Sequence, residues 1–350
     1  MLTSEDKSHL RSVRDLTVST LTEVLGGERI VAIVDAPNQR NVGDSLIWAG
    51  EMEYVEHLGL DVRYVADLWT YDPAALRRAM PRGVILLHGG GNFGDLWPGH
   101  QILREMVVTD LPDYRIIQLP QSIQFRDEER ARVANEIIGA HLDFTALIRD
   151  QVSLQRAAQH LPDVAVRFCP DMALGWDAPQ VSVEKNAANV LVIARADMEA
   201  SSNLASVGDD WLTGVKSRVT DWWPRGKFVL PWRLARSMSL VYRFYVKVRK
   251  RWRWLPVGLP DKFGAFAIKE INRVNIAGAV DMYARARVIV VDRLHAHVLA
   301  VLLGIPHVVM DNNYRKISAI YEEYSGEFST AHYATDLASA RFEAERLLEL

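Results

Sequence analysis

The sequence is poor in three features that would narrow its class at once: cysteine, long apolar runs and net charge. Its one cysteine, Cys169, excludes a disulfide within the chain and a metal site built from several thiolates. Cys169 precedes a proline at the end of an apolar run, so we expect a buried structural thiol rather than a nucleophile. A formal net charge of −3 over 350 residues argues against polyanion binding by bulk charge.

Apolar runs long enough to cross a membrane are also missing. Residues 1–14 are polar and charged and lack the apolar stretch of a signal peptide. The longest uncharged, mostly apolar run, residues 294–310, contains three histidines and is interrupted by Gly304 and Pro306. Because this run is too short and too polar to span a bilayer, we expect a cytoplasmic protein without a transmembrane helix.

The chain does have a repeated alternation of short β-branched runs and longer helical stretches. The first half predicts strands at 29–35, 84–88, 115–119 and 144–148 and helices at 44–58, 128–141 and 151–160. After a polar break at 182–189, the pattern predicts strands at 189–194, 287–292 and 306–311 and helices at 209–223, 263–286, 294–303 and 315–324. Apolar strands separated by helices are typical of parallel sheets covered on both faces.

This alternation predicts an α/β protein with two doubly wound, Rossmann-like domains. We place the domains at residues 1–180 and 181–330, followed by a closing C-terminal helix at 331–350. A cleft between the domains is the expected ligand site, because ligands of open α/β sheets bind beyond the carboxyl ends of the strands.

Two polar segments follow predicted strands of the first domain. In the first, Gly43 allows a tight turn, and Asn41 and Asp44 are candidates for either ligand binding or helix capping. The second is glycine-rich, and we expect a functional loop whose backbone N–H groups face a ligand. It matches neither a P-loop nor a dinucleotide fingerprint, and its candidate residues are Gly89, Gly90, Gly91, Asn92 and Asp95.

Three further polar segments follow predicted strands of the second domain. Arg195 offers a planar guanidinium fork for a carboxylate or phosphate. Arg293 and His295 stand at the start of an apolar helix, whose free N–H groups favour an anion. After the next strand, Asn312, Tyr314 and Lys316 lie where they could reach the same cleft, although Asp311 or Asn312 could instead cap a helix.

Together these segments resemble the polysaccharide pyruvyl transferase family. The resemblance extends over about residues 29–324 and rests on the order of short motifs rather than on any one of them. The motifs are Asn41-Val42-Gly43-Asp44, residues 89–95, Pro120-Gln121-Ser122, Pro170-Asp171-Met172-Ala173, Arg195 with Asp197 and Glu199, Arg293-Leu294-His295, and Asp311-Asn312 with Tyr314 and Lys316.

The resemblance implies a fold similar to that of GT-B glycosyltransferases and a specific reaction. Family members transfer pyruvate from phosphoenolpyruvate to a sugar, form a ketal and release phosphate. The family's Arg-Leu-His segment, associated with phosphoenolpyruvate, corresponds here to Arg293, Leu294 and His295, with Arg195 as the further donor-binding arginine. Asp292, the residue before this segment, departs from the family pattern, because we expect a small or hydroxyl-bearing residue at this position.

The reaction requires a general acid and a general base. We expect His295 to donate a proton or stabilise the leaving phosphate, and Asp44 or Asp95 to orient or deprotonate sugar hydroxyls. Lys316 would join the donor site, and Asn41, Asn92 and the glycines would contact the acceptor. The chemistry calls for no metal and no cofactor apart from phosphoenolpyruvate itself.

A basic, tryptophan-rich insertion at residues 222–260 contains no acidic residue. Ten Lys or Arg residues lie between positions 225 and 253, and five of the ten tryptophans fall in the insertion. Apolar residues at helical spacing with basic neighbours are typical of an interfacial helix on an anionic membrane. The residues expected at the membrane are Trp232, Arg243, Phe244, Lys247, Arg251 and Trp252.

Two alternatives for the insertion are a helix packed on the protein and, less favoured, a segment that binds nucleic acid. The membrane hypothesis predicts a peripheral protein on the inner face of the cell membrane, acting on a saccharide carried by polyprenyl diphosphate. Two different functions stay open at this point: a GT-B glycosyltransferase that uses a nucleotide sugar, and a non-catalytic glycan-binding scaffold of an export complex.

Overall fold

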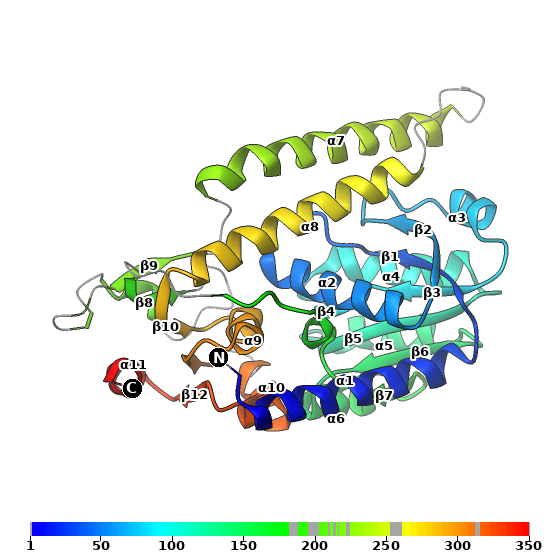
Figure 1. Ribbon diagram of the computed structural model, residues 1–350. Coiled ribbons are helices and arrows are strands. Elements are labelled where there is room, and N and C mark those ends of the chain that lie inside the picture. The colour runs from blue at the N-terminus through cyan, green and yellow to red at the C-terminus, as the bar shows by residue number, and fades with distance from the viewer. Residues whose placement is uncertain are drawn as a thin grey trace.

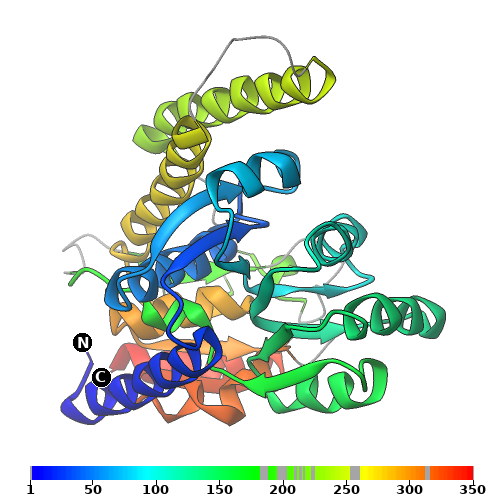
Figure 2. The same ribbon diagram turned by 90° about the vertical axis from the view of Figure 1, so that its right-hand side faces the viewer.

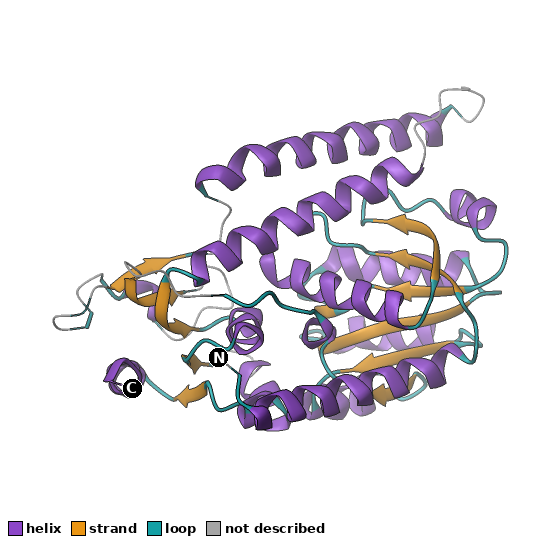
Figure 3. Cartoon of the chain, viewed as in Figure 1, coloured by secondary structure: helices purple, strands orange, loops and turns teal. Residues whose placement is uncertain are grey.

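The computed structural model contains two parallel β-sheets with helices packed around them (Figure 1 and Figure 3). It describes residues 2–181, 188–194, 203–208, 211–212, 215, 217–221, 225–252, 261–311 and 316–349, without the side chains of residues 188, 189, 261 and 316. The predicted α/β class with parallel sheets is therefore confirmed. The GT-B likeness, the cleft and the domain boundaries stay predictions.

The first sheet has the strand order β2-β1-β3-β5-β6-β7, and β4 pairs with the far end of β5. Its strands are β1 (Ile30–Val34), β2 (Asp61–Ala66), β3 (Val84–Leu87), β4 (Gly90–Gly94), β5 (Arg115–Gln124), β6 (Phe144–Ile148) and β7 (Ala165–Phe168). The connecting helices are α2 (Val42–His57), α3 (Pro73–Ala79), α4 (Pro98–Asp110), α5 (Glu128–Gly139) and α6 (Gln151–His160).

The central strands of this sheet form because their side chains are apolar on both faces. Residues 31–34 of β1 have no exposed surface, and they pair in parallel register with Val84–Leu87 of β3. Burying a valine or isoleucine side chain stabilises a fold by about 1.5–3 kcal/mol. Side-chain caps then start the helices at the carboxyl edge: Asn41, Asp127 and Asp150 each accept a hydrogen bond from a first-turn amide.

The second sheet has the order β12-β11-β10-β8-β9. Its strands are β8 (Ala188–Ile193), β9 (Ser217–Thr220), β10 (Ala286–Val291), β11 (His307–Met310) and β12 (Ala331–Ala334), and its helices include α9 (Leu294–Leu303), α10 (Lys316–Glu323) and α11 (Leu337–Glu349). Apart from His295, every residue of α9 is buried. Its apolar residues share one core cluster with Ile33 and Leu46 of the first half, so the two sheets are joined by a continuous core.

An N-terminal helix, α1 (Ser4–Leu25), ties the two halves of the chain together. It starts at a capping box between Thr3 and Asp6. The Asp6 carboxylate also accepts hydrogen bonds from the backbone and hydroxyl of Ser329. Asp6 is 2% exposed, so this contact is part of the interior. The sequence predicted only a polar segment here, and the helix was missed.

Two long helices, α7 (Val229–Arg251) and α8 (Asp261–Tyr283), form an antiparallel pair at the top of the molecule (Figure 1). They follow β9 in the chain, yet α8 packs against α2 of the first half. Gly264 of α8 allows this pair to close, because a Cβ there would lie 2.2 Å from the ring of Tyr242. In both views, α7 is the outermost layer on its side of the molecule (Figure 2).

The sequence prediction was right for β6, α6 and α9, whose observed bounds are the predicted ones. It was wrong for a helix at 209–223, because residues 217–220 are an edge strand that pairs with β8. It was also wrong in treating 331–350 as one helix, since β12 precedes α11. Both errors concern edge strands of only four residues, whose pattern is too short to separate a strand from a helix.

Candidate active site

Polar residues follow directly on the carboxyl ends of strands in both sheets. In the first sheet these include Asp35 after β1, His88 after β3 and Arg149 after β6; in the second, Asp292 follows β10 and Asp221 follows β9. The two edges meet at one point, where α9 of the second half reaches residues of the first. This junction is the candidate active site.

His295 lies at the junction. It stands in the first turn of α9, and its side chain is 13% exposed. Its Nε2 atom is 3.3 Å from a carboxylate oxygen of Asp171 and 3.5 Å from Nη1 of Arg149. On the opposite side its ring packs on Gly43, where a Cβ would lie 2.9 Å from Nδ1. His295 therefore connects the start of α9 with the start of α2.

Asp171 and Arg149 form a buried ion pair beneath His295. Nη1 of Arg149 donates to Asp171 at 2.6 Å, and the side chains are 2% and 1% exposed for Arg149 and Asp171. Burial alone would raise the pKa of Asp171, but Arg149 and His295 more than offset it and hold that pKa well below its usual range. The carboxylate therefore stays ionised and fixes the position of the imidazole. Asp171 belongs to a motif noted in the sequence without an assigned role, and Arg149 was missed.

The start of α9 carries the other donor-site residues that were predicted. Arg293 is the N-cap residue, no side-chain hydrogen bond caps the helix, and Nη2 of Arg293 donates to Asp221 at 3.2 Å. Leu294 is 6% exposed and belongs to the core. Asp292 is 1% exposed and therefore lies inside the protein rather than on the site surface. Burial of Leu294 anchors the turn that presents Arg293 and His295.

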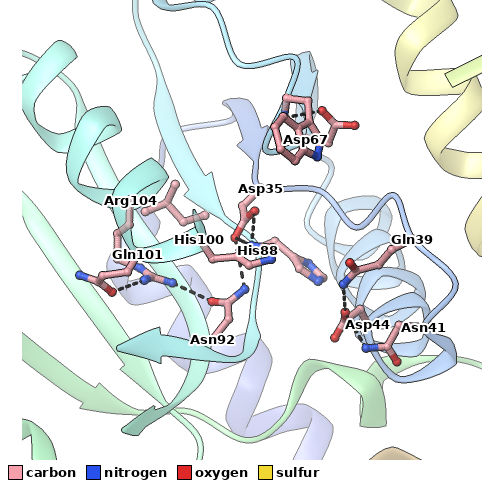
Figure 4. A network of polar contacts seen from close by, with 12 residues as sticks. Asp35, Gln39, Asn41, Asp44, Asp67, His88, Asn92, His100, Gln101 and Arg104 are labelled. Atoms are coloured by element: carbon pink, nitrogen blue, oxygen red, sulfur yellow. Dashed lines mark hydrogen bonds and ion pairs between the residues drawn. The ribbon is translucent and has the colours of Figure 1, made fainter. Parts of the chain in front are cut away.

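The start of α2 forms the other wall of the junction (Figure 4). Asn41 caps the helix by accepting a hydrogen bond from the amide of Gly43 at 2.9 Å. One carboxylate oxygen of Asp44 accepts hydrogen bonds from the side chains of Gln39 and Asn41, both at 2.8 Å. The capping role considered for Asn41 is therefore present. Asp44, the residue after Gly43, is half-buried, and these two hydrogen bonds fix its side chain.

The glycine-rich segment differs from what the sequence suggested. Gly90, Gly91 and Asn92 lie in strand β4, and the backbone amides of Gly89, Asn92 and Gly94 donate to Glu51, Gln121 and Gln101. The prediction that this segment turns its N–H groups to a ligand is therefore wrong for these three residues. Gly89 and Gly94 serve close packing, because a Cβ would lie 2.8 Å from the carbonyl oxygen of Pro120 at Gly89 and 1.9 Å from that of Gln124 at Gly94.

Asp95 also has structural partners. One of its carboxylate oxygens accepts hydrogen bonds from the amides of Arg126 and Asp127, both at 2.8 Å. These bonds fix the turn between β5 and α5. We therefore leave Asp95 out of the catalytic set proposed below and retain Asp44.

Two carboxylate–histidine pairs were not assigned from the sequence, and one of them, Asp35 with His100, is seen in Figure 4. Nδ1 of His100 lies 2.7 Å from Asp35, and Nδ1 of His88 lies 2.8 Å from Glu51. Burial lowers the pKa of each histidine, but its carboxylate partner more than compensates and raises it. His88 is 3% exposed, and its Nε2 has no hydrogen-bond partner among the described residues.

Asp35 has the backbone conformation of a functional position. Its φ of 66° is in the left-handed region, which costs a non-glycine residue about 1–3 kcal/mol. The signal in the sequence was its place at the end of a buried strand, where no role was assigned to it. Its carboxylate and that of Asp44 both favour the protonated form of His88 and so raise its pKa. The His88 ring therefore lies within electrostatic reach of both carboxylates.

Asn92 is held at this edge by a buried arginine. Nη2 of Arg104 donates to Oδ1 of Asn92 at 2.8 Å, and the Asn92 amide group donates to Asp35 at 3.3 Å. Arg104 is 2% exposed, and burial lowers its pKa to about 10, a shift that Asp35 partly opposes. The amide and carboxylate groups here suit a hydroxyl-rich ligand, because they can accept and donate hydrogen bonds.

Several predicted residues lie outside the described residues. These are Arg195, Asn312 and Tyr314, and the side chain of Lys316, so their assigned roles stay predictions. Asp311 is described: one of its carboxylate oxygens accepts hydrogen bonds from the amides of Ile317 and Ser318 at 3.2 and 3.4 Å. The alternative in which Asp311 caps a helix is thus the observed one.

The predicted membrane residues divide between the two faces of α7. Arg243 points inward, with Nη2 donating to Asp67 at 3.0 Å, and the Trp232 ring lies 4.2 Å below the guanidinium of Arg40. These two placements correct the prediction for Arg243 and Trp232, whose groups are engaged by the protein itself. The other four residues are on the exposed face: Phe244, Lys247, Arg251 and Trp252.

Three further features concern the single cysteine, metal ligands and membrane-spanning helices. Cys169 has no exposed surface, as predicted for a structural thiol, and burial raises its pKa. Within the described ranges, His, Cys, Asp and Glu side chains form no cluster of three or more suited to a metal ion. None of the helices over those ranges is both long and apolar enough to cross a membrane.

Comparison with known proteins gives the context of this site. The family described as polysaccharide pyruvyl transferase matches residues 41–314. Pyruvyl transferase 1 of Schizosaccharomyces pombe is 29% identical over 302 residues, which cover 82% of this chain and 67% of that protein. The Bacillus subtilis protein EpsO, whose name assigns it provisionally to the pyruvyl transferases, is 26% identical over 89% of this chain and 90% of its own.

One solved structure supports the fold alone. A functionally uncharacterized protein of Klebsiella pneumoniae subsp. pneumoniae NTUH-K2044 superimposes with a TM-score of 0.54 at 15% sequence identity. The similarity covers 92% of this chain and 98% of that one. The arrangement of two sheets is thus shared over nearly the whole length of both chains.

Proposed function

Because the chain belongs to the polysaccharide pyruvyl transferase family, we propose that it transfers pyruvate from phosphoenolpyruvate to a sugar of an exopolysaccharide or its lipid-linked repeat unit. The product is a pyruvate ketal, and phosphate is released. The observation that carries this proposal is the contact of His295 with Asp171 and Arg149 at the meeting point of the two sheets. An imidazole, an arginine and a helix start there suit an anionic donor.

The donor side is built for two negative groups. Phosphoenolpyruvate carries a phosphate and a carboxylate, and arginine binds either through paired N–H groups. Arg149 lies 3.5 Å from His295, and Arg293 is the N-cap residue of the same helix. The first-turn amides of α9 add a positive helix dipole at this position. Arg149 is thus a donor-binding candidate from the first half of the chain, beside Arg195 and Lys316, which stay predictions.

Proton transfer follows from the position of His295. Protonation of the methylene carbon of phosphoenolpyruvate produces an oxocarbenium-like centre at C2, which a sugar hydroxyl attacks. Phosphate then leaves, a second hydroxyl closes the ketal, and of the two hydroxyl protons one is balanced by the new methyl group and one by phosphate. His295 is the general acid of this scheme, since Asp171 fixes its Nε2 and a partly exposed edge remains for the substrate.

The acceptor side lies at the carboxyl edge of the first sheet. Asp44 and Asn41 offer hydrogen bonds to sugar hydroxyls at the start of α2. Asp44 is the candidate general base, and the buried His88 ring, which Glu51 holds at Nδ1, lies within electrostatic reach of it. The Asp35–His100 pair and Asn92 orient the same ligand. In this proposal residues of both halves bind the donor, namely Arg149 with Arg293 and His295, and residues of the first half bind the acceptor.

Phosphate release tests the reaction directly. The protein is incubated with phosphoenolpyruvate and a panel of lipid-linked or nitrophenyl sugars, and free phosphate and product mass are recorded. We expect phosphate release that depends on the sugar, together with a product heavier by one ketal-linked pyruvate. Transfer from a nucleotide sugar instead would identify a glycosyltransferase, and glycan binding without turnover would identify a scaffold.

Variants separate donor binding from general damage. Arg293→Ala removes one anion contact, so we expect the KM for phosphoenolpyruvate to rise about tenfold or more, with a smaller change in kcat. His57→Ala, at the exposed end of α2, is the matched control and should behave as wild type. An unchanged KM in Arg293→Ala would remove this arginine from the donor site.

The proposed acceptor also suggests a location. If the sugar is carried on a polyprenyl diphosphate, the enzyme works at the surface of the membrane that holds that lipid. We propose that the protein is peripheral on the inner face of the cell membrane and binds anionic lipid. The exposed residues Phe244, Lys247, Arg251 and Trp252 support this proposal.

A further inference from the structure

Helix α7 has two faces with different contents. Its inner side supplies Ala235, Tyr242 and Val246 to the contact with α8, all buried. Between the inner and outer faces, Arg236 donates to the backbone oxygen of Asn38 at 2.8 Å, and Arg243 pairs with Asp67. The inner face and this flank therefore hold α7 rigidly on the protein.

The outer face exposes a row of large apolar side chains. The exposed fractions are 66% for Leu230, 59% for Leu234, 54% for Val241, 69% for Phe244 and 51% for Trp252. Successive spacings of four, seven and three residues put Leu230, Leu234, Val241 and Phe244 on one side of a helix with 3.6 residues per turn, and Trp252 is the C-cap residue that follows its last turn. Exposed single apolar residues are ordinary, but several large apolar side chains gathered on one face of a helix mark an interaction surface.

Basic residues flank this row on one side. Arg233, Lys247 and Arg251 are exposed and lie about a fifth to a quarter of a turn from the centre of the apolar row at helical spacing. Helix α7 contains no Asp or Glu, so its outer face has only positive charge. The binding partner of this face must therefore be both apolar and anionic.

We propose that the outer face of α7 binds an anionic lipid bilayer, with Leu230, Leu234, Val241, Phe244 and Trp252 in the headgroup and upper acyl region. The three flanking cations contact lipid phosphates. This inference deepens the proposed function and rests on it for the choice of a lipid-linked acceptor. The protein would dock through the outer face of α7, and a lipid-linked acceptor would reach the site from the α7 side of the molecule.

A bilayer fits better than a second copy of the chain or a nucleic acid. Antiparallel pairing of two α7 helices would bring basic residues against basic residues without a carboxylate on either helix. Nucleic acid would match the cations but leave five large apolar side chains in water. A bilayer suits both the cations and the apolar side chains, because its surface is anionic and its interior is apolar.

The docking helices also hold the acceptor side of the site. Asn38, at the start of the loop that leads to Asp44, donates to the hydroxyl of Ser239 on α7 at 2.6 Å. On α8, Asn272 donates to the backbone oxygen of Pro37 at 2.9 Å and Asn275 to that of Gln39 at 3.0 Å. Helix α7, which would contact the lipid, and its partner α8 therefore together fix the loop proposed to contact the sugar.

Vesicle co-sedimentation tests this surface. The full chain is mixed with vesicles of phosphatidylcholine alone or with about one third phosphatidylglycerol, at low and high salt. We expect binding to the anionic vesicles only, weakened by salt. Leu234→Ser/Phe244→Ser should reduce that binding at least tenfold. Lys247→Gln/Arg251→Gln should reduce it by about 25-fold, since one cation near an anionic surface contributes about fivefold.

Matched controls use exposed apolar residues elsewhere. Leu142 is 97% exposed and Phe342 is 65% exposed, so Leu142→Ser/Phe342→Ser removes similar side chains from other surfaces and should bind as wild type. Equal binding by the α7 variants, or equal binding to neutral vesicles, would overturn the proposal. A lipid-free dimer that dissociates in the α7 variants would identify a second copy as the partner instead.

Turnover on a soluble sugar separates this inference from the proposed function. Variants of the outer face should keep wild-type phosphate release with a nitrophenyl sugar, because they lie outside the site. Vesicle binding without any phosphate release would refute the proposed reaction and leave the docking surface standing. Normal turnover without vesicle binding would refute the docking surface and leave the proposed reaction standing.

Discussion

His295 and His297 stand two residues apart on α9, yet they have opposite surroundings. His295 is at the junction of the two sheets, partly exposed, beside the Asp171 carboxylate. His297 has no exposed surface; its Nδ1 lies 2.7 Å from His307 and its Nε2 lies 2.7 Å from Ser325. Two residues along a helix rotate a side chain by about 200°, so one histidine faces the site and the other the core.

The surroundings of His297 and His307 decide the charge of these two rings. Nδ1 of His307 donates to the backbone oxygen of Ile305, so the neutral ring of His307 accepts at Nε2 from Nδ1 of His297. Nε2 of His297 then accepts from the Ser325 hydroxyl. Burial lowers the pKa of His297 far below the ordinary value and that of His307 to about 4. The core pair is structural because both of its rings are buried and neutral, whereas Nε2 of His295 lies 3.3 Å from the Asp171 carboxylate at the edge of the interior.

The largest expected effect comes from removing the site histidine. His295→Ala should lower the rate of phosphate release by about 10²- to 10⁴-fold, because it removes the proposed general acid. Its free energy of unfolding should change by less than about 1 kcal/mol, since the ring is at the edge of the interior. Steady-state kinetics and urea unfolding measure both. Full turnover in this variant would exclude a catalytic role, and loss of folding would make His295 structural like His297.

The next effect concerns the ion pair beneath His295. Asp171→Asn should lower the free energy of unfolding by about 3–5 kcal/mol, because Arg149 would remain buried without its carboxylate. It should also lower kcat by loosening the imidazole. Chemical unfolding and the pH profile of turnover report these changes separately.

A double variant tests the reason given for that loss. Arg149→Met/Asp171→Asn removes the charged pair as a whole, so it should be less destabilised than Asp171→Asn while its kcat stays low. If the double variant is the less stable of the two, an unpaired buried arginine is not the cause.

The place of Arg293 and His295 at the start of α9 could be predicted from the sequence, and the residues that support them could not. Arg293 and His295 follow a strand and open an apolar helix, which are local signals. Arg149 and Asp171 come from the ends of two other strands, and only the sheet order brings them to His295. Glu51 lies in the middle of α2, and the sequence alone suggests a surface residue there. In the structure it is buried beside His88, because the fold brings α2 next to the end of β3.

The fold was predictable to a similar extent. Buried strands such as Phe144–Ile148 are marked by continuous apolar runs, and the apolar helix Leu294–Leu303 by its flanking polar residue and glycine. The inward and outward residues of α7 could not be separated in this way. Arg243 and Lys247 look equivalent in sequence, and only Asp67 on the facing loop makes one of them an interior residue.

As the pH falls, protonation of the buried His297–His307 pair should destabilise the fold before the Asp171–Arg149 ion pair is affected. Below pH 6.5 the unfolded chain binds protons at His297 and His307 that the folded chain excludes, so the free energy of unfolding falls as the pH drops toward 4. For His307 alone, the loss reaches about 3 kcal/mol at pH 4. Urea unfolding at a series of pH values measures it.

Two other histidines act in the opposite direction. The raised pKa values of His88 and His100 give stability that is fully present below the ordinary pKa of 6.5 and is lost as the pH rises through the folded pKa. His307→Gln isolates the core contribution, because glutamine can still donate to Ile305 but does not titrate. The variant should show a flatter decline below pH 6.5, and an unchanged slope would remove His307 as a cause.

The smallest effect tests the contact that positions His295. Gly43→Ala would put a methyl group 2.9 Å from Nδ1 of the imidazole, so the ring must move by a few tenths of an ångström. We expect about a tenfold lower kcat, since a small displacement of a general acid weakens its alignment with the substrate. The free energy of unfolding should stay nearly constant, because the ring can shift toward its exposed edge. By contrast, Gly50→Ala in the same helix would put its Cβ 1.8 Å from a backbone oxygen of Met172 and should destabilise the fold. If both variants lose stability and Gly43→Ala keeps full kcat, Gly43 serves helix packing rather than the position of His295.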